Sequence, residues 1–163
     1  MILEFENFLT PDECQALISF GESSGLKPGN TESGTIGYRK AKVSWMDDNW
    51  LVDKIKTGVS NLSGVTVEKQ ERLHFVRYVQ GGEYKEHSDG EFRQKTAMIY
   101  LNNGFRGGET VFPKLNKIIK PETGKLVIWD NIDKQGKEDP LSVHAGLPVD
   151  FGTKYIAVIW IKK

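Results

Sequence analysis

The chain has 163 residues, 38% of them hydrophobic and 27% charged, with 22 lysines and arginines against 22 aspartates and glutamates. This composition is typical of one folded domain with a sizeable core, excludes a disordered chain, and gives no sign of a nucleic-acid partner. No apolar run reaches the roughly 20 residues that cross a bilayer, and the acidic N-terminus lacks the basic residues of a secretory signal, so we expect a cytoplasmic protein without a membrane partner.

Two helices are predicted in the first part of the chain. Thr10 can cap a helix, because Pro11 suits the first helical position and Glu13 can complete a capping box. Asp47 or Asp48 is the expected N-cap of the second helix. The glycine-rich connection between them is interpreted either as a mobile lid or as an ordinary surface loop. In chain order the expected elements are a strand at 2–8, a helix from Thr10, the connection at 21–37, a strand at 38–45 and a helix at 49–62.

From residue 65 onwards the pattern changes to short β-type runs separated by turns. Helices followed by strands favour a mainly β, α+β domain, built as an antiparallel sandwich or barrel with helices on one side. We expect a single domain over 1–163, with supporting elements in 1–64 and the β core in 65–163. The strands are predicted at 65–67, 73–79, 96–101, 110–112, 117–119, 126–129, 142–145 and 155–161.

A metal site would have to use histidine and carboxylate ligands, because the only cysteine is Cys14. His87 and Asp89 lie two residues apart and share one face of an extended chain, which alone is weak evidence for a site. His144, on a distant strand, can supply a second imidazole. Two histidines and one carboxylate form the facial triad of non-haem Fe(II) oxygenases, which leaves positions open for other ligands. His74 is interpreted as an ordinary strand residue.

Lys154 opens the last predicted strand, where alternation places it on one face with Ile156, Val158 and Trp160. If that face lines the interior of the barrel, the ammonium group needs a counter-charge, which an anionic ligand would supply. The alternative is an exposed lysine whose head group stays in water.

An ordered set of motifs runs from about residue 73 to the C-terminus. It resembles the catalytic domain of 2-oxoglutarate-dependent Fe(II) dioxygenases of the prolyl 4-hydroxylase type. The resemblance implies a double-stranded β-helix, or jelly-roll, core. The residues that carry it are Arg77-Tyr78, Gly82, Tyr84, His87, Asp89, Arg93, Thr96, Tyr100-Leu101-Asn102, Gly107-Gly108-Glu109-Thr110, Phe112-Pro113, Pro121, Gly124, His144-Ala145-Gly146, Pro148-Val149 and Lys154.

The resemblance also implies the roles of the site residues. By this resemblance we expect Fe(II) as the cofactor, 2-oxoglutarate and dioxygen as co-substrates, and ascorbate as an accessory cofactor. The reaction couples oxidative decarboxylation of 2-oxoglutarate, to succinate and CO2, to hydroxylation of a peptide or protein proline. The catalytic metal ligands are His87, Asp89 and His144; the distal carboxylate of 2-oxoglutarate is held by Lys154, Tyr78 and Thr110; the substrate is contacted by Tyr84, Arg93 and Trp160.

Two alternatives stay open at this point. The same iron chemistry can act on another side chain, a free amino acid or a small molecule, and a catalytically silent jelly roll can serve as a binding module. Trp160 is equally well interpreted as core, and Trp45, Trp50 and Trp129 are interpreted as packing. The loops at 21–37 and 133–140 are candidates for substrate recognition. The sequence does not set the oligomeric state, and a monomer is compatible with it.

Overall fold

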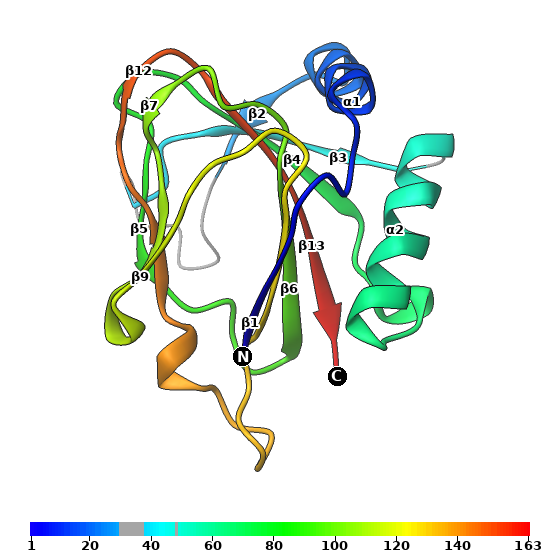
Figure 1. Cartoon of the computed structure of the whole chain (residues 1–163), viewed down its shortest axis with the longest axis vertical. Helices are drawn as coiled ribbons and strands as arrows, with labels where there is room; N and C mark the ends of the chain where they lie inside the picture. The colour runs from blue at the N-terminus through cyan, green and yellow to red at the C-terminus, as the bar shows by residue number, and fades with distance from the viewer. Residues whose placement is uncertain (30–37, 48) are drawn as a thin grey trace.

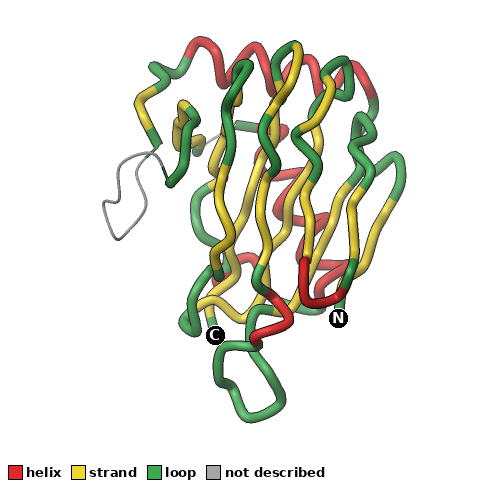
Figure 2. The backbone as a smooth tube through the Cα atoms, turned by 90° about the vertical axis from the view of Figure 1, so that its left-hand side faces the viewer, coloured by secondary structure: helices red, strands yellow, loops and turns green. Residues whose placement is uncertain are grey.

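The computed structural model describes residues 1–29, 38–47 and 49–163. Within these ranges the chain forms antiparallel sheets with helices α1 (Pro11–Ser23) and α2 (Trp50–Ser63). Figure 1 shows both helices on one side of the sheets, and Figure 2 shows the strands running side by side along the long axis of the molecule. No helix in the described ranges is long and apolar enough to cross a membrane.

Two facing sheets make up the jelly-roll core, as the sequence predicts, and a small third sheet closes one end. The large sheet has the order β1 (Ile2–Phe5), β10 (Leu126–Asp130), β6 (Arg93–Tyr100), β13 (Lys154–Lys162), β4 (Leu73–Tyr78), β3 (Lys42–Met46) and β2 (Lys27–Pro28). The second sheet has the order β5 (Tyr84–His87), β11 (His144–Gly146), β8 (Thr110–Phe112) and β9 (Lys117–Ile119). The third pairs β12 (Val149–Phe151) with β7 (Arg106–Gly107), and 3-10 turns occupy Val67–Lys69, Pro113–Leu115 and Pro140–Ser142.

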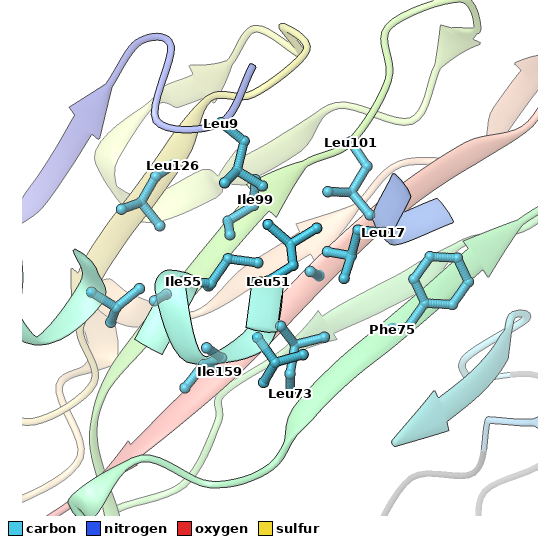
Figure 3. Packing of buried hydrophobic residues seen from close by; sticks show 14 of the residues in the cluster. Leu9, Leu17, Leu51, Ile55, Leu73, Phe75, Ile99, Leu101, Leu126 and Ile159 are labelled. Atoms are coloured by element: carbon cyan, nitrogen blue, oxygen red, sulfur yellow. The ribbon is translucent and has the colours of Figure 1, made fainter. Parts of the chain in front are cut away.

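Strand β13 separates two hydrophobic layers, because its side chains alternate between the faces of the large sheet. Ala157 and Ile159 pack outwards beneath the helices, where Leu51 and Ile55 of α2 are fully buried. Figure 3 shows this layer, in which Ile159 lies among the helix side chains and Leu73 of β4. On the other face Lys154, Ile156, Val158 and Trp160 point between the sheets, as alternation predicts.

Both helices begin at side-chain caps. Thr10 Oγ1 accepts from the Glu13 N–H at 3.1 Å while the Glu13 carboxylate accepts from the Thr10 N–H at 3.0 Å, which is the predicted capping box. The cap of α2 is Asn49, whose Oδ1 accepts from the Leu51 N–H at 2.8 Å. The prediction of Asp47 is therefore wrong, since its carboxylate binds Arg72, and Asp48 lies outside the described residues.

Several other local predictions differ from the structure. The strand expected at 65–67 is wrong: Val67 is exposed and begins a 3-10 turn, because none of the described strands pairs with it. The strand expected at 142–145 begins at His144, after a 3-10 turn whose N-terminus Asp139 caps. Trp50 and Trp45 are 61% and 42% exposed, so neither is a core residue. Of the connection expected at 21–37, α1 and β2 take the first part, and residues 30–37 lie outside the described residues.

Candidate metal centre

Two histidines face each other across the second sheet. His87 ends β5 and His144 begins β11, and the two are direct partners in the antiparallel register. The centres of the two imidazole rings lie 4.3 Å apart. The second sheet thus brings together two residues that are 57 positions apart in the sequence.

A backbone carbonyl holds each imidazole by one of its ring nitrogens. The Nδ1 of His87 lies 2.7 Å from the Lys85 carbonyl, and the Nδ1 of His144 lies 2.8 Å from the Ser142 carbonyl. A carbonyl only accepts, so the proton is on Nδ1 in both rings, and both Nε2 lone pairs are free to bind a cation. Burial, together with the nearby His144, lowers the pKa of His87 to about 4, which keeps its ring neutral.

Asp89 lies between the two histidines, in the loop after β5. One carboxylate oxygen is 3.7 Å from His87 Nε2, and the other is 3.8 Å from His144 Nε2. Burial alone would raise the pKa of Asp89, but His144, His87 and a hydrogen bond donated by Thr96 of β6 lower it overall. The centre therefore presents two imidazole nitrogens and one carboxylate oxygen within 4.8 Å of one another.

Lys154 lies deep in the cavity beside this centre. It is 2% exposed, its Nζ donates to the Gly108 carbonyl at 2.6 Å, and it lies 4.9 Å from the centre of the Tyr78 ring. Among the residues that the structure describes, no carboxylate pairs with it. Burial lowers the pKa of Lys154 to about 7, with Glu109 as an opposing influence. Lys154 thus has the interior position that strand alternation predicts. Its ammonium group could be neutralised by an anionic ligand, as the sequence indicated.

Tyr78 and Thr110, the other two residues predicted to hold 2-oxoglutarate, line the same cavity as Lys154. The Thr110 hydroxyl is engaged by Tyr100, whose own hydroxyl donates to it at 2.8 Å and accepts the Thr110 N–H at 3.2 Å. Burial raises the pKa of Tyr100 out of the physiological range, so its hydroxyl keeps its proton. Tyr100, the last residue of β6, therefore orients Thr110. In the sequence Tyr100 is one of the motif residues but has no assigned role, because its contact with Thr110 depends on how the two sheets pack.

Comparisons with known proteins identify the family. A family model of the 2OG-Fe(II) oxygenase superfamily matches residues 73–162. The chain belongs to this superfamily. A protein of Acanthamoeba polyphaga mimivirus named "Putative prolyl 4-hydroxylase" is 33% identical, over 96% of this chain and 72% of its own length. The chicken prolyl 4-hydroxylase subunit alpha-2 is 32% identical over 76% of this chain, but the chain spans only 26% of that subunit.

A solved structure supports the same family. The oxygenase superposes with a TM-score of 0.83 on a viral collagen prolyl hydroxylase from Paramecium Bursaria Chlorella virus-1 in complex with 2OG, at 29% identity and with 99% of this chain and 95% of that chain covered. This oxygenase is thus a dioxygenase of the prolyl 4-hydroxylase type. Its cofactor is Fe(II), and its co-substrates are 2-oxoglutarate and dioxygen.

The residues of the centre fit this cofactor. Two imidazole nitrogens and one carboxylate suit Fe(II) and leave coordination positions for other ligands. Carbonyls hold Nδ1 of each histidine and a hydroxyl holds Asp89, and metal ligands in proteins are commonly fixed by outer contacts of this kind. The fit extends to 2-oxoglutarate, because the unpaired Lys154 ammonium is matched by a carboxylate.

Of the three residues predicted to contact substrate, Tyr84 and Trp160 line the cavity, whereas Arg93 lies behind Trp160 and is not a lining residue. Tyr84 stacks on His87, with ring centres 3.5 Å apart. Trp160 lines the cavity, and its buried Nε1 has no hydrogen-bond partner among the described residues. Arg93 binds Glu71 through two hydrogen bonds of 2.8 and 3.1 Å and lies 4.1 Å above the Trp160 ring. Contact of these three residues with substrate stays a prediction.

The structure also places residues at the centre that were not identified from the sequence. Trp129, interpreted as packing, does pack, but its ring lies 4.8 Å from that of His144 and lines the cavity. Arg39 lines the cavity too, with its guanidinium 4.9 Å from the centre of the Tyr84 ring. Arg39 stands outside any recognisable motif, so only the fold reveals its position.

Proposed function

We propose that this oxygenase hydroxylates proline in a peptide or protein, with 2-oxoglutarate converted to succinate and CO2. His87, Asp89 and His144 would hold Fe(II). Bound Fe(II) supplies the oxidising chemistry, in which one oxygen atom of dioxygen enters a C–H bond of the substrate and the other enters succinate. The observation that carries the proposal is the two-histidine, one-carboxylate centre beside a buried lysine that has no carboxylate partner among the described residues, in a chain whose relatives are named prolyl hydroxylases.

The chain's own residues bind and orient the reactants. Lys154 would pair with the distal carboxylate of 2-oxoglutarate, and the Tyr78 and Thr110 hydroxyls would complete its hydrogen bonds. This contact fixes the co-substrate so that its other end reaches the metal. The aromatic wall of Tyr84 and Trp160 would suit a pyrrolidine ring, which offers apolar faces and no N–H.

A peptide assay tests the proposal. We expect Fe(II)-dependent consumption of 2-oxoglutarate to rise several-fold when proline-containing peptides are added, with and without ascorbate, because substrate couples the two half-reactions. Matched peptides with alanine in place of proline are the control and should leave the basal rate unchanged. Equal stimulation by both peptide sets would show that another group is the target.

A buried relay holds Asp89 and gives a second prediction. Asn131, which is fully buried, donates from Nδ2 to the Thr96 hydroxyl at 2.8 Å, and that hydroxyl donates to Asp89 at 2.5 Å. Because Thr96 has one proton, the amide of Asn131 directs it towards the carboxylate. We expect Asn131→Leu to weaken Fe(II) binding by about 10–100-fold.

Anaerobic equilibrium dialysis with Fe(II) measures this effect. The control is Asn61→Leu, the same substitution on the exposed surface of α2, which should bind like the wild type. Thr96→Val should resemble Asn131→Leu, whereas Thr96→Ser should keep the relay and the affinity. If Thr96→Val bound Fe(II) like Thr96→Ser, the relay would not position the ligand.

A further inference from the structure

A second cavity adjoins the proposed active site. It has a volume of about 400 Å³ and lies where β2, β3 and β4 meet. Arg39 lines both cavities, and the His74 ring of the second cavity lies 5.1 Å from the ring of Trp160 in the first. Since an extended peptide advances about 3.3 Å per residue, a peptide with its proline at the metal centre can reach this cavity with a neighbouring residue.

The second cavity carries positive charge that is not fully neutralised by the residues that the structure describes. Its cationic side chains are Lys27, Arg39 and Arg72. Arg72 is paired with Asp47, at 2.6 Å from Nε to Oδ2. Neither Lys27 nor Arg39 has a carboxylate partner within the described part of the chain. Because Arg39 is half-buried, its unpaired charge makes this cavity favourable for an anion.

Two buried N–H groups at the cavity also have no acceptor. An Arg39 terminal nitrogen lies 3.3 Å from His74 Nε2, and a guanidinium only donates, so the His74 proton is on Nδ1. His74 is 4% exposed, and burial lowers its pKa to about 3, so the ring stays neutral. Its Nδ1 and the Nε of Arg39 are buried and lack hydrogen-bond partners among the described residues. Both are donors, so the missing partner is an acceptor.

We propose that this cavity binds a carboxylate of the peptide substrate, close to the proline that is hydroxylated. The inference rests on the proposed function and adds a substrate class, namely acidic peptides. The guanidinium of Arg39 would make charge-assisted hydrogen bonds to the carboxylate, and Lys27 would add attraction at the rim. Trp45, 42% exposed at the same cavity, would cover the aliphatic part of the acidic residue.

A peptide series tests this inference. Each peptide has one proline and carries glutamate, glutamine or lysine at one of the three positions before or after it. We expect kcat/KM at one position to be about tenfold higher for glutamate than for glutamine, and lower still for lysine. A further pair, ending in a free carboxylate or an amide directly after the proline, separates a chain terminus from an acidic side chain as the source of the carboxylate.

Variants connect the preference to the cavity. Arg39→Gln and Lys27→Gln should each reduce the glutamate-to-glutamine ratio of kcat/KM towards one. Lys114→Gln, which removes an exposed charge from the 3-10 turn at Pro113–Leu115, a segment that lines neither cavity, should preserve the ratio. Use of a ratio removes any general loss of activity from the comparison, so a variant that folds less well still gives an answer.

The outcomes are distinct. Equal kcat/KM for glutamate and glutamine at every position, with proline hydroxylated, would overturn the acidic subsite and leave the proposed function intact. A preference that persists in both Arg39→Gln and Lys27→Gln would place the subsite elsewhere. If 2-oxoglutarate were consumed but no proline peptide were hydroxylated, the proposed function would fail, and the acidic subsite with it.

Discussion

Asp89→Ala is expected to lower Fe(II)- and 2-oxoglutarate-dependent turnover by at least about a thousandfold. Among the described residues the carboxylate is the only anionic donor of the centre, and it lies between the two histidine nitrogens at 3.7 and 3.8 Å. Without it, only the two imidazoles remain, and they carry no negative charge to attract Fe(II). Succinate release measures turnover, and anaerobic dialysis measures Fe(II) binding.

Two comparisons make this result specific. Asp12→Ala removes an exposed carboxylate from the first turn of α1 and should leave turnover and Fe(II) binding unchanged. His87→Ala should lose activity as Asp89→Ala does, because His87 is the cross-strand partner of His144. Wild-type succinate production in either variant would mean that the iron lies elsewhere.

Lys154→Met is expected to weaken 2-oxoglutarate binding by about 100-fold and yet to stabilise the protein in the absence of 2-oxoglutarate. The buried ammonium has a carbonyl as its hydrogen-bond partner but no counter-ion among the described residues. A methionine of similar length removes that uncompensated charge. The expected gain in the free energy of unfolding at about pH 6 is about 1–3 kcal/mol, after the loss of the hydrogen bond to Gly108.

The dependence on pH follows from the sign of the pKa shift. Burial lowers the pKa of Lys154 from its ordinary 10.5 to about 7. Between these values the unfolded chain binds more protons than the folded chain, so this group makes the wild type more stable as pH rises through the window. Below about pH 7 the full penalty of the buried charge is present. Lys154→Met should lack this dependence in urea unfolding measured across the window.

Lys125 provides the matched control, because it is the other buried lysine. It is 3% exposed, but its Nζ lies 3.2 Å from Glu6 and 3.3 Å from Glu4, and these carboxylates raise its pKa against the opposing influence of burial. Lys125→Met should destabilise the protein by about 1–2 kcal/mol and leave 2-oxoglutarate binding unchanged. If Lys154→Met destabilised the protein to the same extent and bound 2-oxoglutarate normally, Lys154 would be only a structural residue.

The sequence correctly predicts those features of the fold that depend on neighbouring residues alone, such as strand alternation and helix capping. Alternation in the last strand correctly placed Lys154 and Trp160 on the inner face, and the capping box correctly placed the start of α1. The strand at 65–67 was predicted wrongly, because β-branched residues favour a strand only where a neighbouring strand can pair with them.

In the candidate site, too, some residues could be predicted from the sequence and others could not. His87, Asp89 and His144 stand in a recognisable order, and the fold brings them together. Asn131 and Arg39 reach the site through partners that are distant in the sequence: Asn131 through Thr96, and Arg39 through His74 and the Tyr84 ring. Such contacts depend on how sheets stack, which no local pattern encodes.

Tandem mass spectrometry of the product peptide tests the central claim most directly. The peptide is incubated with enzyme, Fe(II), 2-oxoglutarate and dioxygen labelled with heavy oxygen, and the labelled residue is located by fragmentation. The account predicts one heavy oxygen atom on the proline ring, formed in step with succinate and absent with Asp89→Ala. Heavy oxygen on another residue, or a proline product that still forms with Asp89→Ala, would contradict it.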